Sequence, residues 1–263
     1  MMGDGIGMDI IGSVAIVKFP LGSAKKDKIK VAHEILKEHK SIKTVLEKVG
    51  KFKGRLRKQE TKYVLGENTK EVLYRENGCV FRLNVDKTYF SPRLSNERKE
   101  ISSHVKKGDD VLVMFAGVAP YSVVIAKKSK ANKVVSVEIN KEASKYAKKN
   151  VELNKLQKRI EIVQGDVKRI ARNFVAQKRK FDVIVMPRPQ LKESFLHEAF
   201  ILSKSGTRIF YYDFCGIDEM KNIIEKVENE ARDEGRDIKI LRAKIAGEVA
   251  PYRVRLRVDF IVL

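Results

Sequence analysis

Tryptophan is absent from the 263 residues, and the chain has only two cysteines and four histidines. Cys79 and Cys215 lie far apart and lack the spacing of metal ligands, and the histidines form no cluster, so we expect buried thiols and no metal site. No apolar run of about 20 residues appears, and the N-terminus carries no signal-peptide pattern. These absences predict a cytoplasmic protein that does not enter membranes.

Glycine-rich phosphate loops are also missing. The chain contains neither G-x-G-x-x-G, whose backbone amides cradle a pyrophosphate, nor G-x-x-x-x-G-K-[ST], which binds nucleoside triphosphates. Dinucleotides and ATP are therefore not indicated as cofactors. A nucleoside cofactor without phosphate groups remains compatible with the sequence.

Acidic residues are few relative to basic ones. Lys and Arg number 55 against 34 Asp and Glu, which gives a formal net charge of +21. A charge of this sign and size favours a polyanionic partner, above all a nucleic acid. The alternative is a general preference for lysine on solvated helix faces, of which the segment 141–149 is an example.

The first part of the chain, residues 1–94, is predicted to form a small α+β module that contacts RNA. Asn77-Gly78 stands between two strand-like runs and is typical of a tight hairpin turn. The expected elements are strands at Ile11–Phe19, Lys62–Leu65, Glu71–Arg75 and Cys79–Asn84, and a helix at Lys25–Glu38.

Residues 95–263 are predicted to form a larger α/β domain, because strands and helices alternate along them. Such alternation predicts a parallel sheet covered by helices, and two adjacent strands at the end predict an antiparallel edge. This is the outline of a class I, Rossmann-like methyltransferase sheet. The expected strands are 110–115, 133–138, 160–163, 181–186, 206–214, 238–245 and 252–263, and the expected helices are 95–106, 120–129, 141–154, 191–203 and 217–235.

A candidate cofactor site lies where the first strand of this domain ends. Gly117 follows the strand and Pro120 begins the next helix, while the neighbouring strand ends in Glu138. In a parallel sheet, strand carboxyl ends and helix amino ends form the ligand crevice, so Glu138 is placed to hold two ribose hydroxyls. A glycine-poor loop with an acid on the next strand favours S-adenosylmethionine, which carries no phosphate. The alternative is a sheet of this type without a ligand.

Three further segments are candidates for the same site. Asp166 follows the third strand and either accepts a hydrogen bond from an adenine amino group or is an ordinary turn residue. The Pro187-Arg188-Pro189 loop ends the fourth strand and forms a stiff wall beside the substrate or merely a turn, because proline has a fixed φ and no N–H. Glu97 lies in the first turn of a helix, where the helix dipole favours an acid in any case, so a catalytic and a purely structural role are both open.

Taken together, these motifs resemble the archaeal and eukaryotic Trm5-type tRNA (guanine-37-N1)-methyltransferases over nearly the whole chain. The resemblance implies a monomer that uses S-adenosylmethionine to methylate N1 of guanosine 37 in the tRNA anticodon loop and that needs no metal. The matching segments are Tyr89-Phe-Ser-Pro-Arg-Leu-Ser-Asn-Glu-Arg98, Met114-Phe-Ala-Gly-Val-Ala-Pro120, Val137-Glu-Ile-Asn140, Asn150-Val-Glu-Leu-Asn154, Gly165-Asp166 and Tyr211-Tyr-Asp213.

The resemblance also implies roles for individual residues. Glu97 matches the proposed general base for the guanine N1 proton, and Tyr89 matches the aromatic residue that stacks on the flipped base. Arg57 or Arg55 matches an arginine that stabilises charge on O6. The implied catalytic residues are Glu97, Arg57, Tyr89, Pro187 and Pro189; the implied cofactor contacts are Arg98, Phe115, Ala116, Gly117, Val118, Pro120, Glu138, Ile139, Asp166 and Val167; the implied RNA contacts are Arg55, Arg57, Arg93 and Arg188.

Three positions depart from the family pattern. Val113 stands where an Asp is usual and Ala119 where a Gly is usual, so the cofactor loop is expected to differ in shape. Pro187 replaces the Asn of an Asn-x-Pro motif, as in an archaeal subgroup that also methylates C7 of the tricyclic wyosine precursor 4-demethylwyosine. The further N-terminal domain of larger members, which contacts the tRNA elbow, is expected to have no counterpart in these 263 residues.

Two other functions stay open on the sequence alone. The related aminocarboxypropyl transferase of wyosine synthesis shares the fold and the cofactor but transfers a different group. The Glu97 segment and Pro189 favour methyl transfer over that reaction. A basic RNA-binding protein with a decayed cofactor site is the non-enzymatic alternative, because Val113 and Ala119 depart from the pattern of the cofactor loop.

Overall fold

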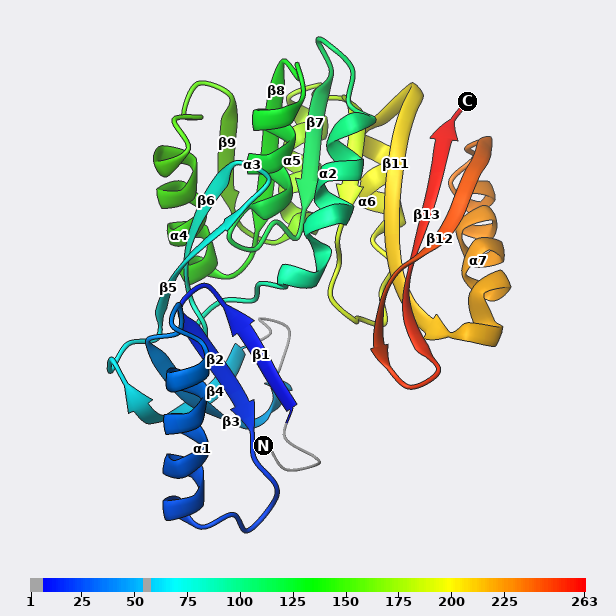
Figure 1. Ribbon diagram of the computed structural model, residues 1–263. Coiled ribbons are helices and arrows are strands. Elements are labelled where there is room, and N and C mark those ends of the chain that lie inside the picture. The colour runs from blue at the N-terminus through cyan, green and yellow to red at the C-terminus, as the bar shows by residue number, and fades with distance from the viewer. Residues whose placement is uncertain (1–6, 54–57) are drawn as a thin grey trace. The chain divides into compact units, whose positions relative to one another are not determined.

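The computed structural model describes residues 7–53 and 58–263, and the chain divides into two compact units, residues 1–92 and 93–263 (Figure 1). The first unit contains a four-stranded sheet with strand order β1-β2-β3-β4, and a separate two-stranded hairpin. Its elements are β1 (Gly7–Ile11), β2 (Val14–Lys18), α1 (Lys25–Glu38), β3 (Thr44–Lys53), β4 (Lys58–Gly66), β5 (Glu71–Glu76) and β6 (Cys79–Asn84).

The start of the first unit corrects one prediction and the hairpin confirms another. The strand predicted at Ile11–Phe19 is β2, but it begins only at Val14, because the chain turns at Gly12 and Ile11 belongs to the antiparallel neighbour β1. Gly12 has a φ of +57°, and a Cβ there would lie 2.3 Å from the Leu73 carbonyl oxygen, so only glycine fits. In the β5–β6 hairpin Asn77 and Gly78 have φ values of +50° and +74°, the left-handed conformation that a two-residue type I′ turn requires.

The second unit is built on a seven-stranded sheet with strand order β12-β13-β11-β10-β7-β8-β9. From β9 across to β11 the strands are parallel, whereas β13 is antiparallel to both β11 and β12, which confirms the predicted antiparallel edge. The strand order reverses between β7 and β10, so the loops after these two strands diverge and leave room for a ligand. The strands are β7 (Asp110–Met114), β8 (Lys133–Glu138), β9 (Ile160–Gln164), β10 (Phe181–Met186), β11 (Ser203–Gly216), β12 (Ile238–Ala250) and β13 (Arg253–Val262).

Helices cover both faces of this sheet (Figure 1), as expected for the predicted Rossmann-like class. α2 packs against α3, and α5, α6 and α7 pack against one another in turn. The helices are α2 (Ser95–Ser103), α3 (Pro120–Lys128), α4 (Lys141–Leu153), α5 (Val167–Ala176), α6 (Leu196–Leu202) and α7 (Met220–Asp233).

Three elements differ from the sequence predictions. β3 and α5 were not expected, although the buried α5 residues Val167, Ile170, Ala171 and Phe174 have helical spacing. α6 begins at Leu196 rather than near residue 191, because the preceding residues form a loop. The other elements of the second unit have the predicted type, with ends shifted by a few residues, which is the usual uncertainty at element boundaries.

β13 is buried on both faces, which matters for the site. Val254, Leu256 and Val258 belong to the main core of the unit. Because side chains alternate along a strand, the residues between them point to the opposite face of the sheet. These are Arg255, Arg257 and Asp259, all buried. Charges buried in this way require partners, and Arg257 finds them in Glu97 and Glu100 of α2 and in Asp259 of its own strand.

Candidate functional site

The loop that follows β7 is a tight, strained turn. Phe115, Gly117 and Ala119 have φ values of +56°, +58° and +64°. Residues other than glycine seldom adopt this conformation, and it costs of order 1 kcal/mol or more where they do. A glycine would adopt the conformation of Ala119 without this cost. Pro120 then begins α3, as predicted.

Glu138 at the end of β8 holds this loop from the side. Its Oε2 accepts a hydrogen bond of 2.7 Å from the Gly117 N–H, and its Oε1 accepts one of 2.6 Å from the Asn140 N–H. Burial raises the pKa of the carboxyl, whereas the N–H groups of Asn140, Gly117 and Ile139 lower it. A carboxylate has about four acceptor positions, so the three N–H groups leave one for a ribose hydroxyl.

Two asparagines keep the cofactor loop in place. The Asn140 side chain caps α4 by accepting hydrogen bonds from the N–H groups of Glu142 and Ala143. Asn150 donates from Nδ2 to the Val118 carbonyl at 2.9 Å and is fully buried. The loop is thus fixed from α4 as well as from β8. Of the other expected cofactor contacts, Ala116 and Val118 are buried in this loop, and Ile139 follows Glu138 directly.

Asp166 follows β9 and caps α5. Its Oδ1 accepts a hydrogen bond of 2.9 Å from the Lys168 N–H, so the carboxylate has a structural role at the helix start. The side chain is half-buried and lies at the same carboxyl edge of the sheet as Glu138. Val167 is the first residue of α5 and is buried in the core.

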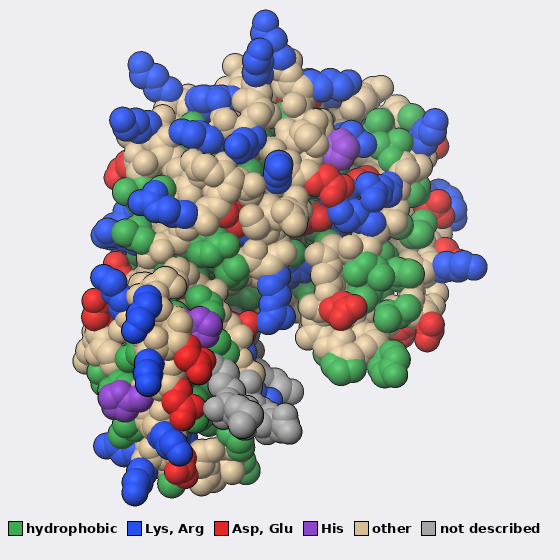
Figure 2. Space-filling view, viewed as in Figure 1, with side chains coloured by type: hydrophobic (Ala, Val, Ile, Leu, Met, Phe, Trp, Pro, Cys, Tyr) green, Lys and Arg blue, Asp and Glu red, His purple; other side chains and the backbone are tan. Residues whose placement is uncertain are grey.

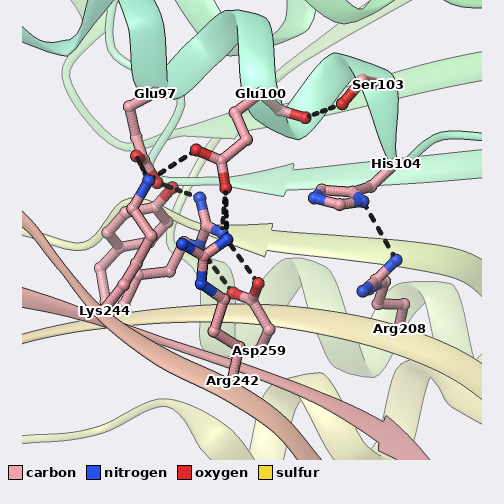
Figure 3. A network of polar contacts seen from close by, with 10 residues as sticks. Glu97, Glu100, Ser103, His104, Arg208, Arg242, Lys244 and Asp259 are labelled. Carbon is pink, nitrogen blue, oxygen red and sulfur yellow. Dashed lines mark hydrogen bonds and ion pairs between the residues drawn. The ribbon is translucent and has the colours of Figure 1, made fainter.

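Glu97 on α2 lies in a buried network of ions that extends to β11, β12 and β13 (Figure 3). The carboxylate is 5% exposed, and its Oε1 accepts hydrogen bonds from Arg257 and, at 2.8 Å, from the Tyr212 hydroxyl. Its Oε2 lies 3.2 Å from Nζ of Lys244. The two oxygens therefore differ, because Oε1 has two buried donors and Oε2 faces a single, partly exposed cation.

Arg257 is the centre of this network. Its Nε and Nη2 bind the two carboxylate oxygens of Asp259 at 2.6 and 2.9 Å, and Nη2 also binds Glu100 at 2.7 Å. Burial raises the pKa of Glu100, but hydrogen bonds from Lys244 and Arg257 and their charges lower it to about 2. Glu100 therefore stays ionised at neutral pH and binds both Lys244 and Arg257, the two cations that contact Glu97 from different sides.

Aromatic side chains close the same region. Burial, with the nearby Tyr121 and Glu97, raises the pKa of Tyr212 well above its usual value, so its hydroxyl remains a donor to Glu97. Tyr121 of α3 packs edge-on against Tyr212 with ring centroids 6.1 Å apart. The guanidinium of Arg98 lies 5.9 Å from the Tyr121 ring centroid, and Arg98 is buried. Arg98, an expected cofactor contact, is therefore part of the α2–α3 packing.

Arg188 requires a correction. We predict it from the sequence as an RNA contact, but its side chain is 0% exposed. It forms an ion pair with Asp213 and donates to the carbonyls of Leu191 and, at 2.8 Å, Glu193. Arg188 thus fixes the loop after β10 from inside, and its charge is already neutralised. Pro187 and Pro189, on either side of it, are half-buried.

The remaining predicted residues are distributed between the two units. Tyr89 is half-buried and belongs to the first unit, whereas Arg93 is exposed at the start of the second. Arg55 and Arg57 lie outside the described residues. Lys and Arg side chains are spread over the visible face of the second unit (Figure 2) rather than gathered in one patch.

Sequence reasoning missed Tyr212, Lys244, Glu100 and Arg257 as neighbours of Glu97. A signal was present in Arg253-Val-Arg-Leu-Arg-Val-Asp259, where charged and apolar residues alternate in the last strand of the chain. Within residues 7–53 and 58–263, no group of His, Cys, Asp and Glu is arranged to hold a metal ion. The same residues include no helix that is long and apolar enough to cross a membrane.

Three related proteins show what the chain resembles. A tRNA (guanine(37)-N(1))-methyltransferase Trm5b of Pyrococcus abyssi is 34% identical over 96% of this chain and 73% of its own length. The tRNA (guanine(37)-N(1))/4-demethylwyosine(37)-methyltransferase Taw22 of Nanoarchaeum equitans is 32% identical over 97% of this chain and 99% of its own. A Methanocaldococcus jannaschii tRNA(Phe) (4-demethylwyosine(37)-C(7)) aminocarboxypropyltransferase is 32% identical over 80% of this chain and 78% of its own.

Solved structures agree with these relatives. The structure of an aTrm5–tRNALeu complex has a TM-score of 0.84 and 28% identity, covering 98% of this chain and 72% of that one. Methanocaldococcus jannaschii Trm5 in complex with adenosine has a TM-score of 0.80 and 28% identity, covering 97% and 74% of the two chains. The sequence profile of the TRM5/TYW2 methyltransferase domain matches residues 72–241. The chain belongs to the TRM5/TYW2 methyltransferase family.

Proposed function

We propose that this protein transfers the methyl group of S-adenosylmethionine to N1 of guanosine 37 in the anticodon loop of tRNA. The observation that carries the proposal is the different environment of two buried carboxylates in the second unit. Glu138 is held by backbone N–H groups beside the cofactor loop. Glu97 is held by side chains from the other half of the sheet, and one of these, Lys244, is partly exposed. Glu138 is therefore suited to accept hydrogen bonds from a neutral ribose, and Glu97 is suited to accept a proton.

The chemistry of the guanine requires a base. Its N1 carries a proton and is a poor nucleophile, so a carboxylate must remove that proton as the methyl moves from sulfur to nitrogen. Glu97 is the proposed base. Negative charge then develops on O6, where a positioned cation lowers the barrier; Arg57 or Arg55 is proposed for this role. Tyr89 is proposed to stack on the guanine once it leaves the loop stack, which offsets the cost of unstacking.

The cofactor would be held by this chain's own loop residues. Glu138 would accept hydrogen bonds from the ribose hydroxyls, and the turn at Phe115–Ala119 would contact the nucleoside through its backbone. Asp166, which caps α5, remains the candidate partner of the adenine amino group. When bound, S-adenosylmethionine supplies the electrophilic methyl group. The first unit, with Arg93, is proposed to contact the RNA backbone, and the protein to act as a cytoplasmic monomer.

The product of the reaction tests the proposal. A tRNA transcript with G37 would be incubated with the protein and S-adenosylmethionine, digested, and examined by mass spectrometry of its nucleosides. The proposal predicts 1-methylguanosine from position 37 and S-adenosylhomocysteine in equal amounts. Methylthioadenosine as the coproduct would instead identify aminocarboxypropyl transfer, and no product with tight RNA binding would identify a non-catalytic RNA-binding protein.

A second substrate is supported by one position. Pro187 stands in the loop after β10, where an asparagine would add an amide beside the target base. The relative Taw22, which is named for both guanine-37 and 4-demethylwyosine methylation, matches nearly all of this chain. We propose C7 methylation of 4-demethylwyosine as a second activity. Incubation of the protein with tRNA that carries this tricycle, followed by the same mass spectrometry, tests it.

A further inference from the structure

Lys244 occupies the position that a substrate proton would need. Its Nζ lies 3.2 Å from Glu97 Oε2 and 2.5 Å from Glu100 Oε2. A base must approach the proton it removes to within about 2.6–3.2 Å between heavy atoms, so guanine N1 and Lys244 compete for the same oxygen. The other oxygen, Oε1, already accepts from Arg257 and Tyr212. With Lys244 in place, Oε2 keeps one acceptor position but remains paired with a cation, so removal of Lys244 would make this oxygen more accessible to the N1 proton.

The strand that carries Lys244 allows this movement. β12 is the edge strand of the sheet, and its pairing with β13 shifts register between Ile240 and Arg242 and again between Ile245 and Gly247. Such irregularities redirect side chains and are frequent near active sites. The Lys244 side chain is 23% exposed, against 0% for Arg257. Lysine is also a compact charge on a flexible stem, which makes it the displaceable partner of the two.

The charges of the network show what the movement would do. With Lys244 in place, the cations Arg242, Lys244 and Arg257 balance the anions Glu97, Glu100 and Asp259. If Lys244 leaves, Arg257 and Arg242 still neutralise Glu100 and Asp259, but Oε2 of Glu97 has lost its cation. A carboxylate that loses a nearby positive charge binds a proton more readily. Departure of Lys244 therefore exposes Oε2 and makes it a stronger base.

We propose that Lys244 is an RNA-contacting residue that exchanges Glu97 for a phosphate of the bound RNA, so that substrate binding itself releases the base. The inference rests on the proposed role of Glu97. In the released state Oε2 takes the N1 proton as the sulfur–methyl bond breaks and the nitrogen–methyl bond forms. The products are N1-methylguanine, S-adenosylhomocysteine and a neutral Glu97, so atoms and charge balance. Arg257 and Tyr212 are positioning residues, which hold the carboxylate through Oε1.

The other groups that face Glu97 are fixed and would not be exchanged. They come from every element packed around it. They are Glu100 on α2, Tyr121 on α3, Tyr212 on β11 and Arg257 on β13. Tyr212 and Arg257 are fully buried, and Glu100, although 29% exposed, is an anion, so a change in the environment of Oε2 on RNA binding is assigned to the partly exposed cation Lys244.

The test compares two lysines of the same strand. Lys244→Met and Lys239→Met each remove one positive charge from β12, but only Lys244 faces Glu97. The affinity of each variant for a G37 tRNA transcript is measured over a range of salt concentrations, and the single-turnover methylation rate is measured against pH at saturating RNA and cofactor. A wild-type log–log salt slope of roughly −3 to −5 is expected for about four to six phosphate contacts.

Lys244→Met is expected to reduce the size of that slope by about 0.7–0.9, the contribution of one phosphate contact, and to leave the pH profile of the saturated complex unchanged. Lys244→Arg should restore the slope, and Lys239→Met should leave it as in wild type. An unchanged slope with a pH profile displaced to higher pH would overturn the proposal, because Lys244 would then remain beside Glu97 in the complex. Equal loss of slope in both Met variants would also overturn it. A Glu97→Gln variant that methylates at the wild-type rate would instead refute the role of Glu97, whatever the slopes.

Discussion

Glu138 and Glu97 are both buried carboxylates, with 8% and 5% of their surface exposed, yet they are held in opposite ways. Glu138 accepts hydrogen bonds from backbone N–H groups at the end of β8. Glu97 is surrounded by side-chain ions from strands at the other side of the sheet. Backbone donors cannot leave, whereas a lysine can. The carboxylate proposed to bind the cofactor is thus held by fixed backbone groups, whereas the carboxylate proposed as the base has one partner, Lys244, on a flexible and partly exposed side chain.

Arg188 is expected to show the largest effect on stability. It forms a buried ion pair with Asp213. Burial raises the pKa of Asp213, but the charge of Arg188 and hydrogen bonds from neighbouring donors bring that pKa below its usual value. Removing one partner of a buried pair typically costs about 3–5 kcal/mol. Arg188→Met should lower the free energy of unfolding by that amount in urea denaturation. Lys226→Met, which removes an outer partner of the same Asp213 at 3.3 Å, should cost about 1 kcal/mol or less. Similar losses in the two variants would show that Arg188 is not the internal anchor.

Replacement of Glu138 tests the preformed side. Glu138→Ala removes the acceptors for the cofactor ribose, and hydrogen bonds to a charged group contribute about 1.5–3 kcal/mol each. S-adenosylmethionine should therefore bind roughly 10- to 100-fold more weakly in calorimetry, while the affinity for tRNA changes little. Glu142→Ala, which removes a neighbouring half-buried carboxylate at the start of α4, is the matched control. Unchanged cofactor affinity in Glu138→Ala would remove Glu138 from the site.

The pH dependence of stability should differ in sign between Glu100, which lies beside Glu97, and Glu138. The pKa of Glu100 is lowered from 4.5 to about 2, so its contribution is complete above pH 4.5 and is lost as the pH falls towards 2. The pKa of Glu138 is raised by burial, so protonation on acidification relieves a cost instead. In thermal melts, the gap between wild type and Glu100→Gln should narrow as the pH falls from 5 to about 2.5. A gap that stays constant across this range would contradict the ion pairs of Glu100.

Pro187→Asn is expected to have the smallest effect. The substitution adds a side-chain amide to the loop after β10, which would favour guanine and crowd a third ring. N1 methylation of guanosine 37 should stay within a few-fold of wild type, and C7 methylation of 4-demethylwyosine should fall. Both rates are measured at saturating cofactor with each substrate. Equal loss of the two activities would mean that Pro187 only supports the loop conformation.

The sequence was most informative where a pattern is local. The alternation of strands and helices from Asp110 onward, the hairpin turn at Asn77-Gly78 and the antiparallel edge were all predictable, because each depends on neighbouring residues. The tight conformation of Ala119 could be anticipated only as a departure from the related sequences. Its strain depends on backbone angles that composition does not reveal.

The partners of Glu97 were not predictable in the same way. Lys244 and Arg257 are separated from it by most of the second unit, and only the sheet order β12-β13-β11 brings them to α2. The position of Arg188 after a strand that ends at the crevice predicts an RNA contact, but the structure buries its side chain. Long-range ion pairs are determined by topology, so a single sequence indicates them only through charged residues in an otherwise apolar strand.

The rate of methyl transfer by Glu97→Gln against pH tests the central claim most directly. Single-turnover rates would be measured for wild type and the variant at saturating tRNA and S-adenosylmethionine. The account predicts a loss of roughly 10²–10⁴-fold, the usual contribution of a general base, with RNA and cofactor affinities unchanged and with the acid limb of the wild-type profile absent from the variant. A variant within a few-fold of the wild-type rate, with the same dependence on pH, would contradict the assignment of Glu97 as the base.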